Sequence, residues 1–163
     1  MRDLSKIHEN VQGAIIGLEP RYKIHDHSEY PAEIRSPYDF AAALGYPIQR
    51  ITKTVFLRSR DGQAYVAAVC SADRRLNFAS VANAIGAKHV AVASPEDLQV
   101  KTGYPTNGVS PLGLSQGIPV IMDSLLFDYE TILIGGGAAA IEIEVAPADL
   151  ARISAATVDS ISA

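Results

Sequence analysis

The chain has 163 residues, of which 48% are hydrophobic, and its formal net charge is −4. A chain of this length and composition can bury enough apolar surface to fold without disulfides, and we predict one domain over residues 1–163. The negative charge argues against a general DNA- or RNA-binding protein, because such proteins gain most of their affinity by neutralising phosphates. Residues 50–101 nevertheless contain eight basic and four acidic side chains. Scattered solvated charge explains this excess, and a local basic patch that guides one RNA end is the alternative.

The single cysteine, Cys70, rules out a disulfide framework and suits a reducing compartment. It ends the apolar run 64–70 and has no evident activating partner, so a small core residue is favoured over a nucleophile. No charged and then apolar leader starts at Met1, and no apolar stretch reaches the roughly eighteen residues of a membrane span. We therefore expect a cytoplasmic protein that does not enter a membrane.

The N-terminal segment has apolar residues at helical spacing, which predicts an amphipathic helix: Leu4, Ile7, Val11, Ile15 and Leu18. An extended segment follows at 22–25. Ser36, Pro37 and Asp39 together are typical of a helix start, because serine caps the free N–H groups and proline is favoured in the first turn. Gly45 is expected to end that helix.

Two strands, 51–58 and 64–70, are predicted to form a hairpin through Asp61-Gly62. The remaining elements are marked by alternating apolar residues or by cap residues: strands at 90–93 and near 118–122, 130–134 and 141–145, and helices beginning at Asn77, Ser94 and Pro147, the first of which stops at Gly86. Hairpins mixed with helices predict an α+β domain with a curved, mixed sheet.

The segment Thr102–Gly113, TGYPTNGVSPLG, is rich in residues that shape the backbone. Glycine supplies positive φ, asparagine tolerates it, and proline removes donors. The N–H groups of Asn107, Gly108 and Val109 could therefore point together at a carbonyl or phosphate oxygen. An ordinary surface turn is the alternative.

Lys53 lies in the predicted strand 51–58, on the same face as Ile51, Val55 and Leu57 by the alternation of strand residues. This face is apolar except for one ammonium group. A lysine in such a place either extends to solvent at the strand end or meets an anionic or carbonyl ligand in a pocket.

Three other motifs imitate known sites. Gly113–Gly117 matches G-x-S-x-G, but no histidine follows His89, so Ser115 is not expected to be a nucleophile. The glycines at 135–137 imitate a dinucleotide fingerprint, yet the next residues alternate like a strand, and a tight hairpin is the better interpretation. His25-Asp26-His27 lacks the spaced further ligands of a zinc site, and we predict no metal.

Several of these segments, in this order and spacing, resemble the YbaK/ProX family: Lys53-Thr54, Thr102-Gly-Tyr, Gly108–Gly113, Pro119–Asp123 and Ile141–Glu144. The resemblance runs from about Ile24 to Leu150. Members of that family are aminoacyl-tRNA deacylases related to the editing insertion domain of bacterial prolyl-tRNA synthetase. It implies a partly barrel-like sheet flanked by helices, no cofactor, and hydrolysis of the ester of a misacylated tRNA.

The resemblance also implies a set of site residues. Lys53 falls on the family's lysine at the deacylation site, and the segment around Gly108, Ser110 and Pro111 falls on its glycine-rich substrate loop. This chain departs from better-known members at His27, where they have Tyr, at Asn107, where they have Gly, and at Gly135, where they have Ser. Glu142 replaces Asp, and Ala138-Ala139 replace a frequent Lys-Arg pair, which weakens phosphate contacts.

We accordingly expect catalytic roles for Lys53, Asn107 and Gly108, and substrate-binding roles for the following residues: His27, Thr54, Ser110, Gly135 and Glu142. Lys53 would anchor the terminal adenosine phosphate or polarise the ester, while main-chain N–H groups hold the carbonyl. His27 would orient the amino acid or water, or serve as a structural histidine.

The expected substrate is tRNA(Pro) carrying a small residue such as Ala, Cys or Ser, since steric closure discriminates small side chains better than binding does. An aminoacyl-tRNA synthetase is a second candidate partner. The alternatives are a non-catalytic module that binds an aminoacyl-tRNA end, a nucleotide or a synthetase, and, more remotely, a serine esterase using Ser115.

Overall fold

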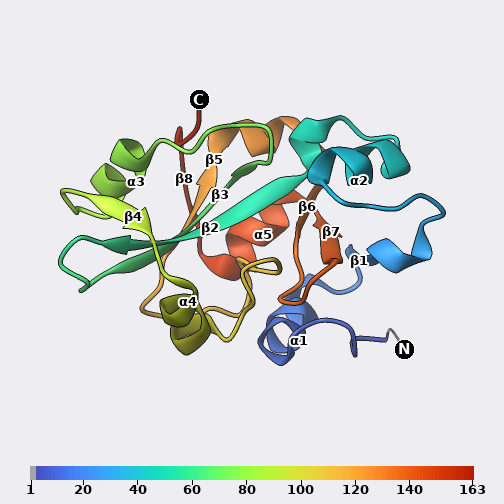
Figure 1. Cartoon of the computed structure of the whole chain (residues 1–163), viewed down its shortest axis with the longest axis horizontal. Helices are drawn as coiled ribbons and strands as arrows, with labels where there is room; N and C mark the ends of the chain where they lie inside the picture. The colour runs from blue at the N-terminus through green and yellow to red at the C-terminus, as the bar shows by residue number, and fades with distance from the viewer. Residues whose placement is uncertain (1–2) are drawn as a thin grey trace.

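The computed structural model describes residues 3–163, which form five α-helices and eight β-strands (Figure 1). The helices are α1 (Glu9–Ile15), α2 (Pro37–Leu44), α3 (Phe78–Ala84), α4 (Pro95–Thr102) and α5 (Pro147–Ser154). The strands are β1 (Tyr22–Asp26), β2 (Thr52–Ser59), β3 (Tyr65–Ser71), β4 (Val90–Val92), β5 (Val120–Asp123), β6 (Ile132–Gly135), β7 (Ile141–Val145) and β8 (Thr157–Asp159).

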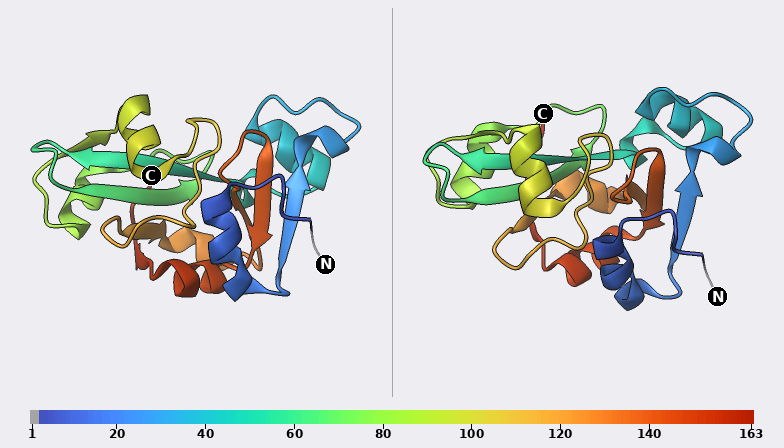
Figure 2. Two further views of the ribbon diagram at one scale, coloured as in Figure 1. Left: turned by 90° about the horizontal axis from the view of Figure 1, so that it is seen from below. Right: turned by 60° about the horizontal axis from the view of Figure 1, so that its bottom comes forward.

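The strands form two sheets rather than one. A five-stranded mixed sheet has the order β4-β2-β3-β5-β8, and an antiparallel three-stranded sheet has the order β1-β7-β6. The smaller sheet stands beside one end of the larger one (Figures 1 and 2), and a single parallel bridge between Ile51 and Leu133 joins them. The predicted α+β class with a mixed sheet is confirmed, but the sheet does not close into a barrel.

Alternation along β2 and β3 separates two hydrophobic cores. Leu57, Val66 and Ala68 pack with Val81 of α3 on one face of the larger sheet. Ala67 and Val69 belong to the main core on the other face, which also takes in residues of α1, α5, β6 and β7. Both faces of β3 are therefore buried in a core that helices help to form.

Three helices begin at the cap residues that the sequence predicts. Ser36 Oγ accepts a hydrogen bond from the Asp39 N–H, and Gly45 ends α2 with φ of 71°. Asn77 and Ser94 cap α3 and α4 in the same way. The N-terminal helix is shorter than its apolar spacing predicts, because α1 begins only after His8, whose ring accepts from the Asn10 N–H.

The glycines at 135–137 form the turn between β6 and β7, which pair antiparallel, so the hairpin interpretation is confirmed and a dinucleotide fingerprint is not present. The segment Gly113–Gly117 leads into β5 rather than into a helix, which does not fit a nucleophile elbow. Within residues 3–163, no helix is long and apolar enough to cross a membrane.

Candidate active site

A cavity of about 560 Å³ lies where β2, the loop 102–113, the β6–β7 hairpin and the start of α2 meet. Seven of the eight residues predicted for the site line this cavity: His27, Lys53, Thr54, Asn107, Gly108, Gly135 and Glu142. They come from five separate segments, which only the tertiary fold brings together. Ser110 is the one predicted site residue that does not line the cavity.

Ser110 is fully buried, and its hydroxyl accepts a hydrogen bond from the Leu112 N–H at 3.1 Å. It holds the loop in shape from inside and does not line the cavity. Of the residues predicted to bind substrate, Ser110 thus lies outside the cavity in this structure, and a role for it in substrate binding stays a prediction.

The N–H groups of Gly108 and Asn107 in this loop differ in whether they are free to bind a ligand. The Gly108 N–H donates to the Pro105 carbonyl at 3.1 Å, which closes a turn and occupies a donor that was expected to face a substrate. No hydrogen bond from the Asn107 N–H to another described residue is present, and Asn107 lines the cavity. Of the three N–H groups expected to point at one oxygen, that of Gly108 is thus already used in this conformation.

Glycine is required where the loop meets the β6–β7 hairpin. A Cβ atom on Gly108 would meet the backbone of Ala138 at under 3.0 Å, and one on Gly135 would meet the Val109 carbonyl oxygen still closer. The loop therefore lies directly against the hairpin, and both glycines permit that approach.

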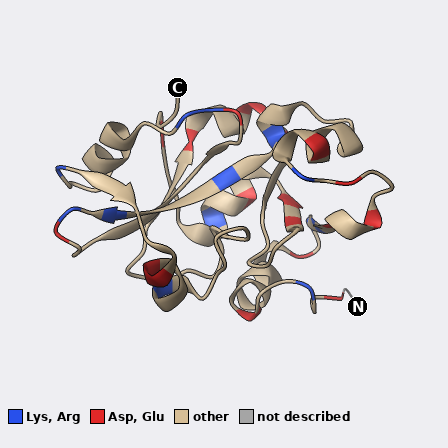
Figure 3. Ribbon diagram, viewed as in Figure 1, with Lys and Arg blue, Asp and Glu red and all other residues tan. Residues whose placement is uncertain are grey.

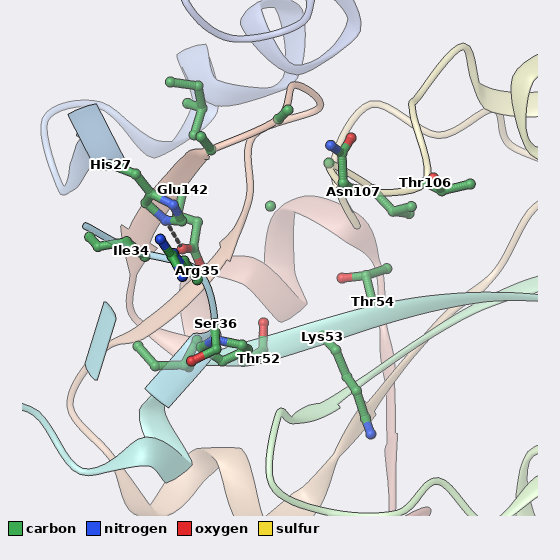
Figure 4. A pocket seen from close by; sticks show the side chains of 18 residues that line it. His27, Ile34, Arg35, Ser36, Thr52, Lys53, Thr54, Thr106, Asn107 and Glu142 are labelled. Atoms are coloured by element: carbon green, nitrogen blue, oxygen red, sulfur yellow. Dashed lines mark hydrogen bonds and ion pairs between the residues drawn. The ribbon is translucent and has the colours of Figure 1, made fainter. Parts of the chain in front are cut away.

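Strand β2 presents hydroxyls to the cavity. Thr52 and Thr54 extend toward it, whereas Lys53 leaves the strand on the opposite side and points away from Asn107 (Figure 4). Thr52 Oγ1 donates to the Leu133 carbonyl at 2.7 Å. Thr54 Oγ1 is buried and has no hydrogen-bond partner in the described structure. An unpartnered buried hydroxyl at a cavity is a group that a bound ligand can satisfy.

The position of Lys53 corrects one geometric expectation. Polarisation of an ester held by the loop, one of the two roles expected for Lys53, requires its ammonium group to face the loop, but the main chain of β2 lies between them. Lys53 is half-buried, pairs in register with Cys70 of β3, and makes no ion pair with the described residues. It lies at the cavity margin without pointing into the cavity.

On the other side of the cavity, His27 and Glu142 form a hydrogen-bonded pair with a distance of 2.6 Å between Nε2 and Oε2. Figure 4 shows this pair facing the side that carries Thr54 and Asn107. The His27 N–H donates to the Ala140 carbonyl, and the imidazole ring lies 4.5 Å from the Phe40 ring. The ring is therefore held by the backbone, by packing and by a carboxylate.

A second, more buried polar cluster lies beside the first. His25 Nε2 contacts Glu144 Oε1 at 2.8 Å, and the hydroxyls of Tyr46 and Thr131 donate to Glu144 Oε2. Burial alone would raise the pKa of Glu144, but the hydrogen bonds from Thr131, Tyr46 and His25 outweigh it and hold that pKa below its usual value. The cluster ties β1 and β7 to the segment around α2.

His25, Asp26 and His27 therefore have three different sets of partners. Asp26 binds Lys6 at 2.6 Å, and this hydrogen bond, with those from Ser28, lowers the Asp26 pKa to about 2. Among residues 3–163, no three His, Cys, Asp or Glu side chains are grouped so that they could hold a metal ion.

Several other residues line the cavity that were not predicted from the sequence to belong to the site: Ile34, Arg35, Ser36, Thr52, Thr106 and Ile141. Arg35 adds a guanidinium group at the rim, where it pairs with Glu33 at 2.9 Å. The helix-start signal at Ser36 placed this segment before α2, but nothing local indicated that α2 begins at the cavity.

Charged residues are otherwise dispersed. Basic and acidic residues are interspersed along the ribbon in Figure 3. Of the basic residues in 50–101, Lys53 alone lines the cavity, whereas Arg50 pairs with Glu144 and Arg58 with Asp97. This favours scattered charge over a dense basic patch.

Two alternative nucleophiles lie elsewhere. Ser115 lines a separate cavity of about 550 Å³ between the loop 111–120, α1 and the end of α5. Cys70 is fully buried, which raises its thiol pKa to about 11. Neither side chain reaches the cavity that contains His27 and Thr54.

Comparison with known proteins identifies related sequences and folds. Residues 31–153 match the model of the aminoacyl-tRNA editing domain. A protein of Enterococcus faecalis described as a candidate Cys-tRNA(Pro)/Cys-tRNA(Cys) deacylase, EbsC, is 32% identical over 108 residues, which cover 66% of this chain and 65% of that protein. Proline–tRNA ligase of Fervidobacterium nodosum is 32% identical over 107 residues, or 66% of this chain, and the match spans only 18% of the ligase.

Two solved structures share the fold over nearly the whole chain. The hypothetical protein APE2540 superposes with a TM-score of 0.81 at 28% identity, covering 95% of this chain and all of its own. A candidate trans-editing enzyme for prolyl-tRNA synthetase gives a TM-score of 0.79 at 22% identity, covering 96% and 99%. With the editing-domain match over three quarters of its length, the chain belongs to the aminoacyl-tRNA editing domain family.

Proposed function

We propose that this chain hydrolyses the ester bond between a tRNA and a wrongly attached amino acid, acting on free aminoacyl-tRNA. The observation that carries the proposal is the convergence of seven predicted site residues, from five separate segments, on one cavity, in a chain that belongs to the editing-domain family. An aminoacyl ester is already activated. Its hydrolysis needs a positioned water and stabilisation of the carbonyl oxygen, without a protein nucleophile.

The substrate class follows from the shape and polarity of the site. Apolar side chains of Ile34, Val109 and Ile141 share the cavity with the Thr54 hydroxyl. A cavity with apolar walls can discriminate between acyl groups by their size. We propose alanine, cysteine or serine on tRNA(Pro) as substrates, and the name of the Enterococcus faecalis relative supports cysteine.

For Lys53 we propose binding of a phosphate near the 3′ end of the tRNA. The lysine is at the cavity margin, has no carboxylate partner in the described chain, and points away from Asn107. A cation in that position can neutralise a backbone phosphate, whereas polarisation of an ester inside the cavity would require the side chain to pass around β2.

A non-catalytic module that holds an aminoacyl-tRNA end is the second candidate. Two observations favour it: the Gly108 N–H is already bonded to Pro105, and Ala138 and Ala139 supply no cations beside the β6–β7 turn. Such a module would bind the acylated end and leave the ester intact. Partnership with a prolyl-tRNA synthetase and action in the cytoplasm, where tRNAs are aminoacylated, are part of both proposals.

A panel of charged tRNAs tests the two candidates. The purified chain is incubated with tRNA(Pro) carrying labelled Ala, Cys, Ser or Pro, and release of the amino acid is measured against the spontaneous rate. We expect release of at least one small residue and none of proline. Tight binding with no release above the spontaneous rate would refute the hydrolase and support the binding module.

Lys53→Met tests whether Lys53 binds a tRNA phosphate or takes part in the hydrolysis of the ester. We expect weaker binding of the charged tRNA, a smaller dependence of binding on salt, and little change in the single-turnover rate at saturation. Arg60→Met, which removes an exposed cation that does not line the cavity, is the matched control. A large loss of single-turnover rate in Lys53→Met would instead place the ammonium at the ester.

A further inference from the structure

The cavity has two chemically different sides. One side carries Thr54, whose buried hydroxyl lacks a partner, and Asn107. The other carries His27 and Glu142, whose side chains are hydrogen-bonded at 2.6 Å (Figure 4). A group bound between the two sides therefore meets hydroxyl and amide groups on one flank and an imidazole on the other.

The partners of His27 fix which ring nitrogen is available. The Glu142 carboxylate can only accept a hydrogen bond at neutral pH, so Nε2 must carry the proton in the neutral imidazole. Nδ1 then holds the basic lone pair, and no described residue donates to it. His27 lines the cavity. A cavity-lining histidine that is oriented by a carboxylate and has its other nitrogen unbonded has the arrangement of a general base.

The neighbouring His25 shows what a structural histidine looks like in the same strand region. Both of its ring nitrogens are engaged, Nδ1 with the Tyr30 hydroxyl and Nε2 with Glu144, and its side chain is only 3% exposed. The side chain of His27 is 22% exposed, uses one nitrogen, and lines the cavity. The two histidine–carboxylate pairs are therefore not equivalent.

Other charged groups near His27 are already paired. Asp26, the preceding residue, binds Lys6, and Lys6 also contacts Glu29. Arg35, which lines the same cavity from the segment before α2, pairs with Glu33. The contact from α2 itself is the uncharged Phe40 ring. Glu142 is thus the carboxylate that acts directly on the His27 ring.

We propose that His27, oriented by Glu142, is the general base that activates water for ester hydrolysis in this chain. The inference rests on the proposed function and adds the group that moves the proton. His27 Nδ1 removes a proton from a water molecule, and the water oxygen forms a bond to the ester carbonyl carbon. The bond from that carbon to the ribose oxygen then breaks. The imidazolium gives its proton to that oxygen, which leaves as a ribose hydroxyl. The products are the free amino acid and deacylated tRNA, and His27 is regenerated.

The test compares His27→Gln and Glu142→Gln with the wild type in single-turnover deacylation of whichever of Ala-, Cys- or Ser-tRNA(Pro) the wild type hydrolyses fastest. We expect His27→Gln to lower the saturated rate by about 10²- to 10⁴-fold. We expect binding of the charged tRNA to change little. Glu142→Gln keeps the shape of the pair and removes the negative charge, so it should lower the saturated rate less than His27→Gln does.

Two further measurements distinguish a base from a structural residue. The wild-type rate should fall in acid along a limb that His27→Gln removes, and added imidazole should restore part of the rate of His27→Ala. His89→Gln, which changes an exposed histidine outside the cavity, should keep the wild-type profile. Thermal unfolding of each variant shows whether it folds.

The outcomes separate the two proposals. If the wild type releases the amino acid and His27→Gln retains both its rate and its acid limb, the general-base assignment is wrong and the proposed function stands. If the wild type releases nothing from any charged tRNA, the proposed function fails and the base assignment fails with it.

Discussion

Gly135 at the end of β6 and Val109 in the loop 102–113 are in such close contact that a Cβ atom on Gly135 would overlap the Val109 carbonyl oxygen. The loop and the β6–β7 hairpin therefore share one boundary of the cavity, and they leave no space between them for a side chain at position 135. A serine at this position, as in better-known members of the family, requires the loop to stand further from β6.

Gly135→Ser should consequently be costly in this chain. We expect a loss of about 1–3 kcal/mol in the free energy of unfolding, as for other overpacked sites, and a lower deacylation rate because the loop must shift. Urea unfolding and charged-tRNA turnover measure the two effects. Gly117→Ala, where a Cβ atom meets nothing within 4 Å, is the matched control and should leave both quantities nearly unchanged.

The two threonines of β2 that face the cavity should respond in opposite ways to loss of the hydroxyl. Thr52 donates to the Leu133 carbonyl, so Thr52→Val should destabilise the fold by about 1–3 kcal/mol. Thr54 Oγ1 has no partner, so Thr54→Val should leave stability equal or higher and lower turnover roughly two- to tenfold by removing one hydrogen bond to substrate. A Thr54→Val variant that unfolds more easily than Thr52→Val would contradict this account.

The cluster around Glu144 should make stability depend on acid. The folded-state pKa of Glu144 lies below its ordinary value of 4.5, so the folded protein binds fewer protons there than the unfolded chain. Its contribution to stability is complete above that ordinary value and is lost as the pH falls through the lower, folded-state pKa. Urea unfolding from neutral pH into the acid range should show this decline, and Glu144→Gln should be less stable at neutral pH with a flatter acid dependence.

Cys70 should be chemically silent in the folded protein. Burial raises its thiol pKa to about 11, so at mildly alkaline pH almost no thiolate is present and reagents cannot reach the sulfur. We expect no reaction with a disulfide reagent until urea unfolds the chain, and one thiol per chain thereafter. Rapid labelling of the folded protein would show that β3 opens locally.

The sequence predicted the strand and its alternation at Lys53, but not which face of the strand carries the cavity. The apolar residues beside Lys53, Val55 and Leu57, belong to the core that α3 covers. The opposite face of β2, which carries Thr54, is therefore the face that borders the cavity. The apolar pattern contained this information, because a face rich in large apolar side chains is more readily used for packing than for binding a polar ligand.

Features that depend on contacts distant in the chain could not be predicted. The three residues of β8 are exposed and form a strand only because they pair with β5, so no alternation marks them. Arg35 lies in the connection between β1 and α2, and it lines the cavity together with Glu142 of β7, which is distant in the sequence. His27 was singled out from the resemblance, but its partnership with Glu142 joins residues 115 positions apart and became visible only in the fold.

The opposite directions of Lys53 and Thr54 have a consequence for how this enzyme family can diversify. Under the proposed function, consecutive residues of one strand recognise two parts of the substrate on opposite sides: Lys53 binds the nucleic acid by its charge, and Thr54 binds the acyl group by its hydroxyl. A substitution of Lys53 alone can therefore change the preference for a tRNA without changing the preference for an amino acid. A substitution of Thr54 alone can do the opposite. An inserted or deleted residue in β2 would exchange the two tasks at once, so this strand should accept substitutions far more readily than changes in length.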